Sequence, residues 1–235
     1  MFEMRRFIWI VCIALLSLWL LFLCGKKLKQ RWIVEKTLSS EHWQQRNEEI
    51  KNTPPDKYKV VFLGNSLTEL FNVNEYFADT TLLNCGIVGD FSEGLVKRID
   101  NITKLKPEKL FIEIGINDII EKIALDDICA NYREVIKKMQ TQSPQTKIYI
   151  QSNLPVIINR PSFLTDNKDV NNRILAQNEN LKKIAQEFNL TYVDIHTAFI
   201  KYPKLNDLFV SDGVHLTPTA YNIWKTTLMP YLYSK

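Results

Sequence analysis

A serine that follows closely on an apolar run is the first candidate for chemistry in this sequence. Ser66 stands behind Gly64 and Asn65 at the end of the run Val60–Leu63, and Leu67–Phe71 can begin a helix after it. Such a strand-to-helix transition lifts a hydroxyl out of the sheet, at the edge where open α/β sheets place ligands. We therefore predict a nucleophilic serine here. A turn or helix-capping serine is the alternative, because these residue types are also ordinary turn chemistry.

An aspartate and a histidine near the C-terminus can supply the base that such a nucleophile needs. A serine hydroxyl reacts when a neighbouring group takes its proton. His215 is the candidate base, and Asp212 precedes it by three residues, a spacing that can place both on one face of a helical turn. Asp212 would then hold the imidazole in its reactive tautomer. The alternative is a turn with an incidental histidine.

Two further residues are candidates for stabilising an oxyanion. Gly89 and Asn117 each come after an apolar run that can form a strand, as Ser66 does. The ends of parallel strands meet at one edge of a sheet, so we expect these residues to lie together. We predict an oxyanion hole formed by the backbone N–H groups of Ser66 and Gly89 and the side-chain amide of Asn117. Gly86 is a rival for Gly89.

The polar segments stand in the order serine, glycine, asparagine, then aspartate-x-x-histidine. This order resembles the SGNH hydrolase superfamily, also called GDSL-type esterases and lipases, over about residues 57 to 232. The resemblance implies a carboxylic ester hydrolase with a Ser66-His215-Asp212 mechanism and no cofactor or metal, and it favours Gly89 over Gly86. The stretches 148–155 and 171–180 resemble a bacterial acetylhydrolase-like branch, which favours short acyl groups.

The resemblance leaves the natural substrate open. An acyl ester of a lipid and one of an acylated carbohydrate fit equally, and acyl transfer to an acceptor other than water is an alternative to hydrolysis. A catalytically silent envelope-binding protein of the same fold is the alternative from another class, and the intact set of site residues argues against it. The formal charge of +4 is modest and much of the excess falls in residues 26–31, so we expect no nucleic-acid partner.

Other residues that could take part in catalysis are weaker candidates. His196 follows Asp194 in a strand-like run, and we predict a structural role because this pair matches no catalytic segment of the resembled family. Cys85 adjoins the predicted oxyanion segment and is an alternative nucleophile, although no histidine is paired with it in the sequence. No spacing is typical of a zinc site, and no glycine-rich loop carries the lysine of a phosphate site.

Alternating strand-like and helix-like segments must position these residues. Strands are predicted at Tyr58–Leu63, Thr81–Asn84, Lys109–Ile114, Lys147–Gln151 and Thr191–Ile195. Helices are predicted at Leu67–Phe77, Ser92–Leu105, Asp126–Gln142, Val170–Phe188 and Pro218–Tyr231. This alternation predicts an α/β fold with a mostly parallel five-stranded sheet covered on both faces. The resembled superfamily has that three-layer α/β/α, flavodoxin-like arrangement.

The N-terminus is predicted to be a transmembrane helix within residues 1–25. Phe7–Cys24 is apolar apart from Ser17 and reaches about 27 Å as a helix, close to the ~30 Å hydrocarbon core of a bilayer. We expect a single-pass anchor in the bacterial inner membrane. Four basic residues after the span against two before it favour a cytoplasmic domain, whereas the resemblance favours an exported one, so the side stays open. A lipidated Cys24 is the alternative to an uncleaved anchor.

The remaining chain is predicted to divide at the prolines Pro54 and Pro55. Residues 26–55 are polar and helix-compatible and are predicted to form a juxtamembrane stalk. Proline ends such a helix, so the hydrolase domain is predicted to be residues 56–235. We accordingly expect no catalytic contribution from residues before 56.

Overall fold

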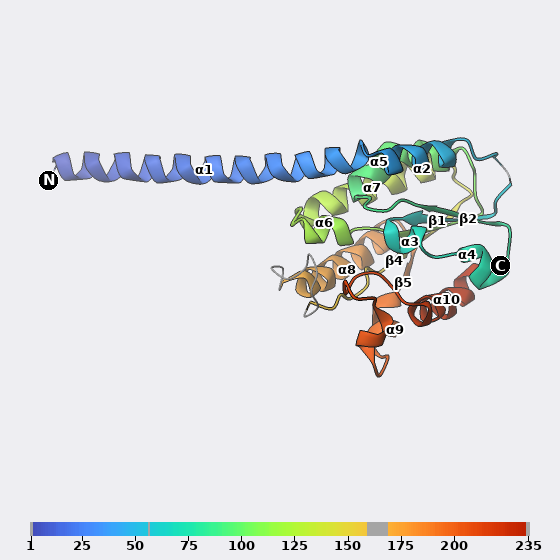
Figure 1. Cartoon of the computed structure of the whole chain (residues 1–235). Coiled ribbons are helices and arrows are strands. Elements are labelled where there is room, and N and C mark those ends of the chain that lie inside the picture. The colour runs from blue at the N-terminus through green and yellow to red at the C-terminus, as the bar shows by residue number, and fades with distance from the viewer. Residues whose placement is uncertain (1, 56, 159–168, 234–235) are drawn as a thin grey trace.

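The computed structural model describes residues 2–55, 57–158 and 169–233, and residue 56, the predicted start of the hydrolase domain, lies outside them. Within these residues one five-stranded sheet lies between two layers of helices (Figure 1). The strands are β1 (Val60–Gly64), β2 (Leu82–Gly86), β3 (Lys109–Glu113), β4 (Lys147–Gln151) and β5 (Thr191–Val193). All neighbours are parallel in the order β2-β1-β3-β4-β5, which confirms the predicted α/β class and its parallel five-stranded sheet.

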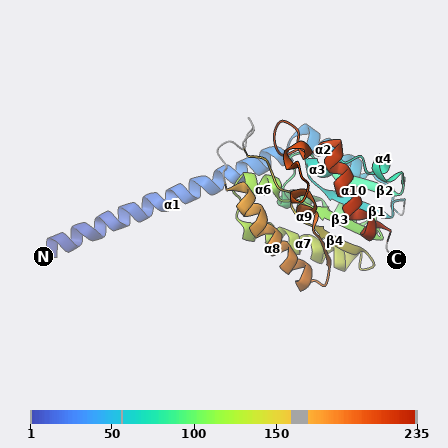
Figure 2. The same cartoon turned by 90° about the horizontal axis from the view of Figure 1, so that it is seen from below.

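Helices cover both faces of the sheet. They are α1 (Phe2–Leu38), α2 (Glu41–Lys51), α3 (Ser66–Glu69), α4 (Val73–Phe77), α5 (Ser92–Thr103), α6 (Ile116–Ile120), α7 (Leu125–Gln142), α8 (Val170–Glu187), α9 (Ile195–Ile200), the 3-10 helix η1 (Leu205–Leu208) and α10 (Pro218–Leu232). One layer holds α5, α7 and α8 side by side, with α2 packed against α5. The other holds α10 with α4 and α9 (Figures 1 and 2).

An aromatic ladder fixes the register of the central strands. Phe62 of β1, Phe111 of β3 and Tyr149 of β4 are paired in register, with ring centroids 5.2 and 4.5 Å apart. Phe71 and Trp224 of α10 stack on each other at 5.3 Å, and Phe71 also packs on Phe62. Stacked rings bury a large apolar area in one geometry, so they resist a slip of one strand past another.

This register brings three strand ends to the same level. Gly64 at the end of β1 pairs with Gly86 of β2 on one side and with Glu113 of β3 on the other. The loops after these strands therefore begin at a common edge. Ser66 begins α3, Gly89 lies in the loop after β2, and Asn117 lies in α6, so all three follow closely on these strand ends, in agreement with their predicted convergence.

The first predicted helix differs from the structure. Instead of one helix over 67–77, the chain forms the short helices α3 and α4. The side-chain amide of Asn84 on β2 donates to the carbonyl oxygens of Thr68 and Phe71 at 2.6 and 2.8 Å. These contacts hold the segment against the edge strand, and the chain reverses there instead of continuing as a helix. Neither α6 nor α9 was expected, because five or six residues give too short a periodic pattern.

The N-terminal helix differs from two predictions. A transmembrane helix was predicted within residues 1–25, and within the described residues no helix is both long and apolar enough to cross a membrane. The predicted boundary after Gly25 is also absent, because α1 continues through it without a break to Leu38. Figure 1 shows α1 extending away from the layered part of the protein, with only its C-terminal end against it.

The segment predicted to be a stalk is packed on the α/β layers. Val34 and Leu38 of α1 and Trp43 and Ile50 of α2 are each at most 5% exposed and belong to the main hydrophobic core. Ser40 caps α2 by accepting a hydrogen bond from the backbone N–H of Trp43. The packed unit therefore extends N-terminally beyond the predicted boundary at 56. Its apolar side chains recur along one side of two helices and are buried against α5.

Candidate active site

Ser66 lies at the turn from β1 into α3. Asn65 caps that helix, since its Oδ1 accepts from the backbone N–H of Leu67 at 2.9 Å. A Cβ on Gly64 would lie 2.2 Å from the carbonyl oxygen of Glu113 and 2.2 Å from Oγ1 of Thr68. Glycine is therefore required for the close approach of this turn to β3. The result is a serine that is 5% exposed at the carboxyl edge of the sheet.

Ser66, His215 and Asp212 form one hydrogen-bonded line. Oγ of Ser66 lies 2.9 Å from Nε2 of His215, and Nδ1 of His215 lies 2.6 Å from Oδ2 of Asp212. An Nδ1–H that donates to the carboxylate leaves Nε2 free to accept the serine proton. The side chains of His215 and Asp212 are 30% and 29% exposed, so water reaches the pair. This arrangement can deprotonate a serine hydroxyl.

A closed loop holds Asp212 and His215, whereas a helical turn was predicted. Oδ1 of Asp212 accepts from the backbone N–H groups of Val214 and His215 at 2.8 and 2.9 Å, and a bridge between Phe209 and Leu216 closes the loop. Burial acts to raise the pKa of Asp212, but the hydrogen bonds from His215 and the two backbone groups outweigh it and hold the pKa below its ordinary value. The carboxylate therefore stays ionised beside the imidazole.

The predicted oxyanion residues lie at the same edge of the sheet. Gly89 has a φ of +78°, in the left-handed region that favours glycine. Asn117 lies in the first turn of α6, and its Nδ2 donates to the carbonyl oxygen of Asp90 at 2.9 Å. One amide hydrogen of Asn117 is thus used for orientation and the other is left for a ligand. Within the described residues, no acceptor bonds the backbone N–H of Ser66 or Gly89.

The alternative candidates occupy structural positions. His196 lies in α9, is 8% exposed, and donates its backbone N–H to Oγ of Ser152 at 2.8 Å. Asp194 caps α9 by accepting from the backbone N–H of Thr197, so the structure does not pair Asp194 with the His196 ring. Cys85 is fully buried, and burial raises the pKa of its thiol to about 12. A thiol in that state is a poor nucleophile at neutral pH.

A second aspartate cluster lies behind the loop that carries Gly89, and the sequence did not single it out. The side chains of Asp90 and Arg98 are completely buried, with Nε of Arg98 2.9 Å from Oδ2 of Asp90. Nε1 of Trp43 donates to the other carboxylate oxygen at 2.9 Å. Arg98 also donates to the carbonyl oxygens of Cys85 and Gly64, which ties the ends of β2 and β1 together. An arginine amid the apolar positions of α5 was the one available signal.

Two more buried carboxyl groups lie near this edge. Burial raises the pKa of Glu113 at the end of β3 to about 7, and the hydrogen bond from Nδ2 of Asn153 opposes that shift. Burial likewise raises the pKa of Asp118 to about 7, although it accepts from Oγ and the backbone N–H of Ser92. These hydrogen bonds link β3 to the segment that follows β4 and α6 to the start of α5, so both groups brace the elements that carry the site.

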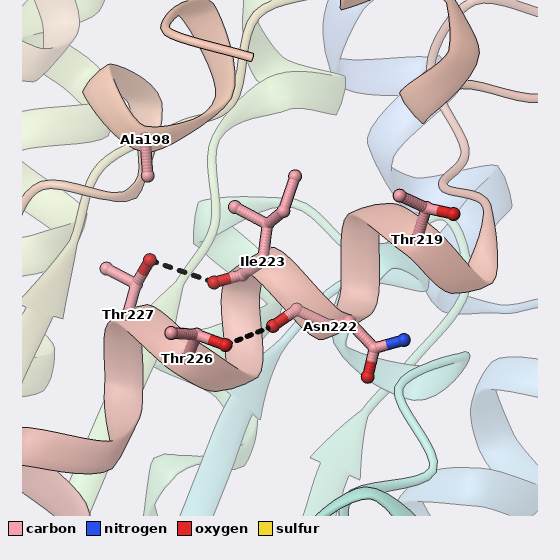
Figure 3. A pocket seen from close by; sticks show the side chains of 6 residues that line it. All are labelled: Ala198, Thr219, Asn222, Ile223, Thr226 and Thr227. Atoms are coloured by element: carbon pink, nitrogen blue, oxygen red, sulfur yellow. Dashed lines mark hydrogen bonds between the residues drawn. The ribbon is translucent and has the colours of Figure 1, made fainter.

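A shallow groove of about 390 Å³ lies apart from these residues, over α9 and α10 (Figure 3). It is lined by Ala198, Thr219, Asn222, Ile223, Thr226 and Thr227. The hydroxyls of Thr226 and Thr227 donate to backbone carbonyl oxygens four residues earlier in α10. These two hydroxyls are therefore satisfied within the helix, and the groove contains none of the predicted site residues.

Comparisons with known proteins identify a family and a set of similar folds. A model of the GDSL-like lipase/acylhydrolase family matches residues 62–223, a range that includes all five predicted site residues. A Streptococcus pneumoniae structure bearing the name platelet activating factor is 21% identical with a TM-score of 0.74, over 89% of this chain and 99% of that one. A GDSL-like lipase from Bacteroides thetaiotaomicron is 23% identical with a TM-score of 0.69, over 80% and 96%.

A further similar structure is a catalytic mutant of an acetylxylan esterase from Geobacillus stearothermophilus. It is 19% identical with a TM-score of 0.61, over 77% of this chain and 97% of that one. No curated protein matched the sequence. At these identities the structural similarities show a shared fold, and the evidence for a family is the match of its model to most of the chain.

Proposed function

The chain belongs to the GDSL-like lipase/acylhydrolase family and is an ester hydrolase, and on that premise we propose a serine mechanism with Ser66 as nucleophile. His215 is the general base, and Asp212 orients and stabilises it. The observation that carries this proposal is the hydrogen-bonded line from Ser66 through His215 to Asp212, with distances of 2.9 and 2.6 Å. A serine in this setting has both a proton acceptor and a carboxylate behind that acceptor.

The reaction proceeds in two halves. Oγ of Ser66 attacks the acyl carbon while Nε2 of His215 takes the serine proton, and the Asp212 carboxylate stabilises the imidazolium. His215 then gives that proton to the leaving alcohol as its C–O bond breaks, which leaves an acyl group on Ser66. A water molecule attacks this acyl group while His215 takes one of its protons. Return of the proton to Oγ releases the carboxylic acid and restores the enzyme.

We assign the stabilisation of the negative charge that develops on the acyl oxygen to three hydrogen-bond donors. They are the backbone N–H groups of Ser66 and Gly89 and the second amide hydrogen of Asn117. The hydrogen bond from Asn117 to the carbonyl oxygen of Asp90 supports this assignment, because it fixes the orientation of the amide before substrate binds. Loss of one such donor typically lowers the rate by about 10²- to 10³-fold.

The substrate we propose is a short-chain acyl ester carried by a carbohydrate or a lipid, with water as the acceptor. The resemblance of residues 148–155 to acetylhydrolase-like proteins supports a short acyl group. The acetylxylan esterase among the similar structures supports it as well, since its name specifies an acetyl ester of a carbohydrate.

The test is hydrolysis of p-nitrophenyl esters by the purified full-length chain. Ser66→Ala should reduce turnover of the acetyl ester to the background rate while leaving the unfolding midpoint near that of the wild type. Ser143→Ala is the matched control, because Ser143 is buried but caps α7 and contacts none of the proposed site residues. Wild-type turnover by Ser66→Ala would refute the nucleophile. A series from acetyl to palmitoyl esters measures the preferred acyl length.

A further inference from the structure

Side chains of helix α2 form hydrogen bonds at both ends of the loop between β2 and α5. We call residues 87–91, which include Gly89, the oxyanion loop. On the strand side, Arg46 donates from Nη2 to the carbonyl oxygen of Asn84 at 2.8 Å and from Nε to that of Gly86 at 3.3 Å. On the helix side, Nε1 of Trp43 donates to Oδ1 of Asp90 at 2.9 Å. Trp43 and Arg46 are three residues apart, so one face of α2 makes both contacts.

Asp90 connects the hydrogen bond from Trp43 to the proposed oxyanion donors. Its backbone follows Gly89 directly, and its carbonyl oxygen holds the side-chain amide of Asn117. Its carboxylate divides its hydrogen bonds, with Oδ2 facing Arg98 and Oδ1 facing Trp43 and the backbone N–H of Phe91. The orientation of Asp90 therefore sets two of the three donors at once. Among the residues that the structure describes, Trp43 supplies the one side-chain donor to Oδ1.

The same N-terminal segment lies close to the oxyanion loop at Gly89 and is linked to Val88 through Glu69 of α3. A Cβ on Gly89 would lie 3.2 Å from Cγ2 of Thr37, so the end of α1 lies directly behind this glycine. Nε2 of His42 lies 3.1 Å from Oε2 of Glu69, and the same oxygen accepts from the backbone N–H of Val88. The loop is thus enclosed between α3 and the two N-terminal helices.

We propose that Trp43 is a positioning residue for ester hydrolysis, whose indole N–H fixes Asp90 so that the donors of Gly89 and Asn117 face the developing oxyanion. The inference rests on the proposed function and adds Trp43 of α2 to the residues that position the reacting groups. The oxyanion exists only during reaction, so weaker positioning lowers kcat and leaves ground-state binding almost unchanged. A misplacement of about 1 Å costs on the order of 100-fold in rate.

The test is Trp43→Phe in the full-length chain, which keeps a buried ring and removes the N–H donor. We expect kcat for p-nitrophenyl acetate to fall about 10- to 100-fold and KM to change by less than about threefold. Trp32→Phe makes the same change at a tryptophan that is 59% exposed and should keep wild-type kcat. Ile50→Val, a buried position at the far end of α2, should lower the urea midpoint and keep kcat.

Each outcome bears on one claim. Wild-type kcat in Trp43→Phe, with Ser66→Ala inactive, overturns the positioning role and leaves the proposed function standing. An active Ser66→Ala overturns the proposed function itself. A loss of kcat in Ile50→Val as large as that in Trp43→Phe would assign the effect to weakened folding and overturn the proposal. If Trp43→Phe does not fold, Arg46→Met at a partly exposed position removes the hydrogen bonds from α2 to the other end of the loop. Wild-type kcat in Arg46→Met would then overturn the proposal that α2 positions the oxyanion loop.

Discussion

Two aspartates near the carboxyl edge of the sheet differ in their exposure to solvent and in the side chains that they bond. Asp212 is 29% exposed and bonds a histidine that bonds Ser66. Asp90 is completely buried and bonds Arg98 and Trp43. We call these groups the Ser66 cluster (Ser66, His215, Asp212) and the Asp90 cluster (Asp90, Arg98, Trp43). One carboxylate bonds an imidazole ring, and the other bonds a guanidinium group and an indole N–H.

The contrast shows how exposure separates reactivity from support. In the Ser66 cluster, water can reach the His215 and Asp212 side chains, and the proposed mechanism requires His215 to exchange a proton with Ser66 and the substrate. In the Asp90 cluster, a lost charge would leave its partner unpaired in the core, at a cost of about 3–5 kcal/mol. The buried cluster therefore stays in one state, and that constancy suits a group that holds the oxyanion loop.

The largest effect expected from this comparison concerns the Ser66 cluster. His215→Ala should lower turnover of p-nitrophenyl acetate by about 10⁴-fold or more, and adding Ser66→Ala should lower it little further, because the members of such a group act as a unit. His196→Ala is the control and should stay within about threefold of wild type, since His196 does not contact Ser66. An inactive His196→Ala beside an active His215→Ala would show that the wrong histidine was assigned.

Equivalent changes at the two aspartates sharpen the comparison further. Asp212→Asn should lower turnover by roughly 10³- to 10⁴-fold with little change in the urea midpoint, because an amide oxygen still accepts from Val214 and His215. Asp90→Asn should instead lower the free energy of unfolding by about 3–5 kcal/mol, because Arg98 loses its buried counter-charge. Turnover per folded molecule should fall less in Asp90→Asn than in Asp212→Asn. A fully stable Asp90→Asn would remove the contrast.

The smallest expected effect is a pH dependence of stability from Glu113. Burial raises the pKa of this carboxyl from 4.5 to about 7 in the folded protein. The folded state therefore keeps a proton that the unfolded state releases, so this contribution is full below pH 4.5 and is lost as the pH rises through 7. The total loss should be on the order of 1–3 kcal/mol in the free energy of unfolding.

Urea titrations of wild type and Glu113→Gln between pH 4.5 and 8 measure this effect. The glutamine variant should lose a large part of the downward slope. Some slope of the same sign should remain, because the pKa of Asp118 is also raised to about 7. An unchanged slope in Glu113→Gln would mean that this carboxyl does not titrate in that range.

Local patterns were enough to locate the sheet and the residues at its edge. Lys147–Gln151 was predicted with the observed bounds, because a short apolar run between polar turns has one simple interpretation. Ser66 and Asn117 were found because they follow such runs, and parallel strands end at a common edge. The three-residue spacing of Asp212 and His215 predicted their proximity but not its form, since a helical turn and a carboxylate-closed loop share that spacing.

Contacts between distant segments could not be predicted from the sequence. Trp43 lies 47 residues from Asp90, and a tryptophan in a polar helix has the same local pattern in a free stalk as in a packed one. The apolar run before Gly25 was interpreted by its composition, length and flanking charges, none of which fixes where the helix that contains it ends. Tertiary packing determines the burial of Trp43, because neither neighbours along the chain nor periodicity carries that information.

The bond between Ser66 and His215 also links two distant parts of the chain. It joins residues 149 positions apart, so the proposed nucleophile and its proposed base are brought together only by the folded α/β layers. A fragment that lacks the loop around His215 would keep Ser66 and lose the group proposed to accept its proton. We therefore expect such a fragment to cleave no esters even if it keeps part of the fold.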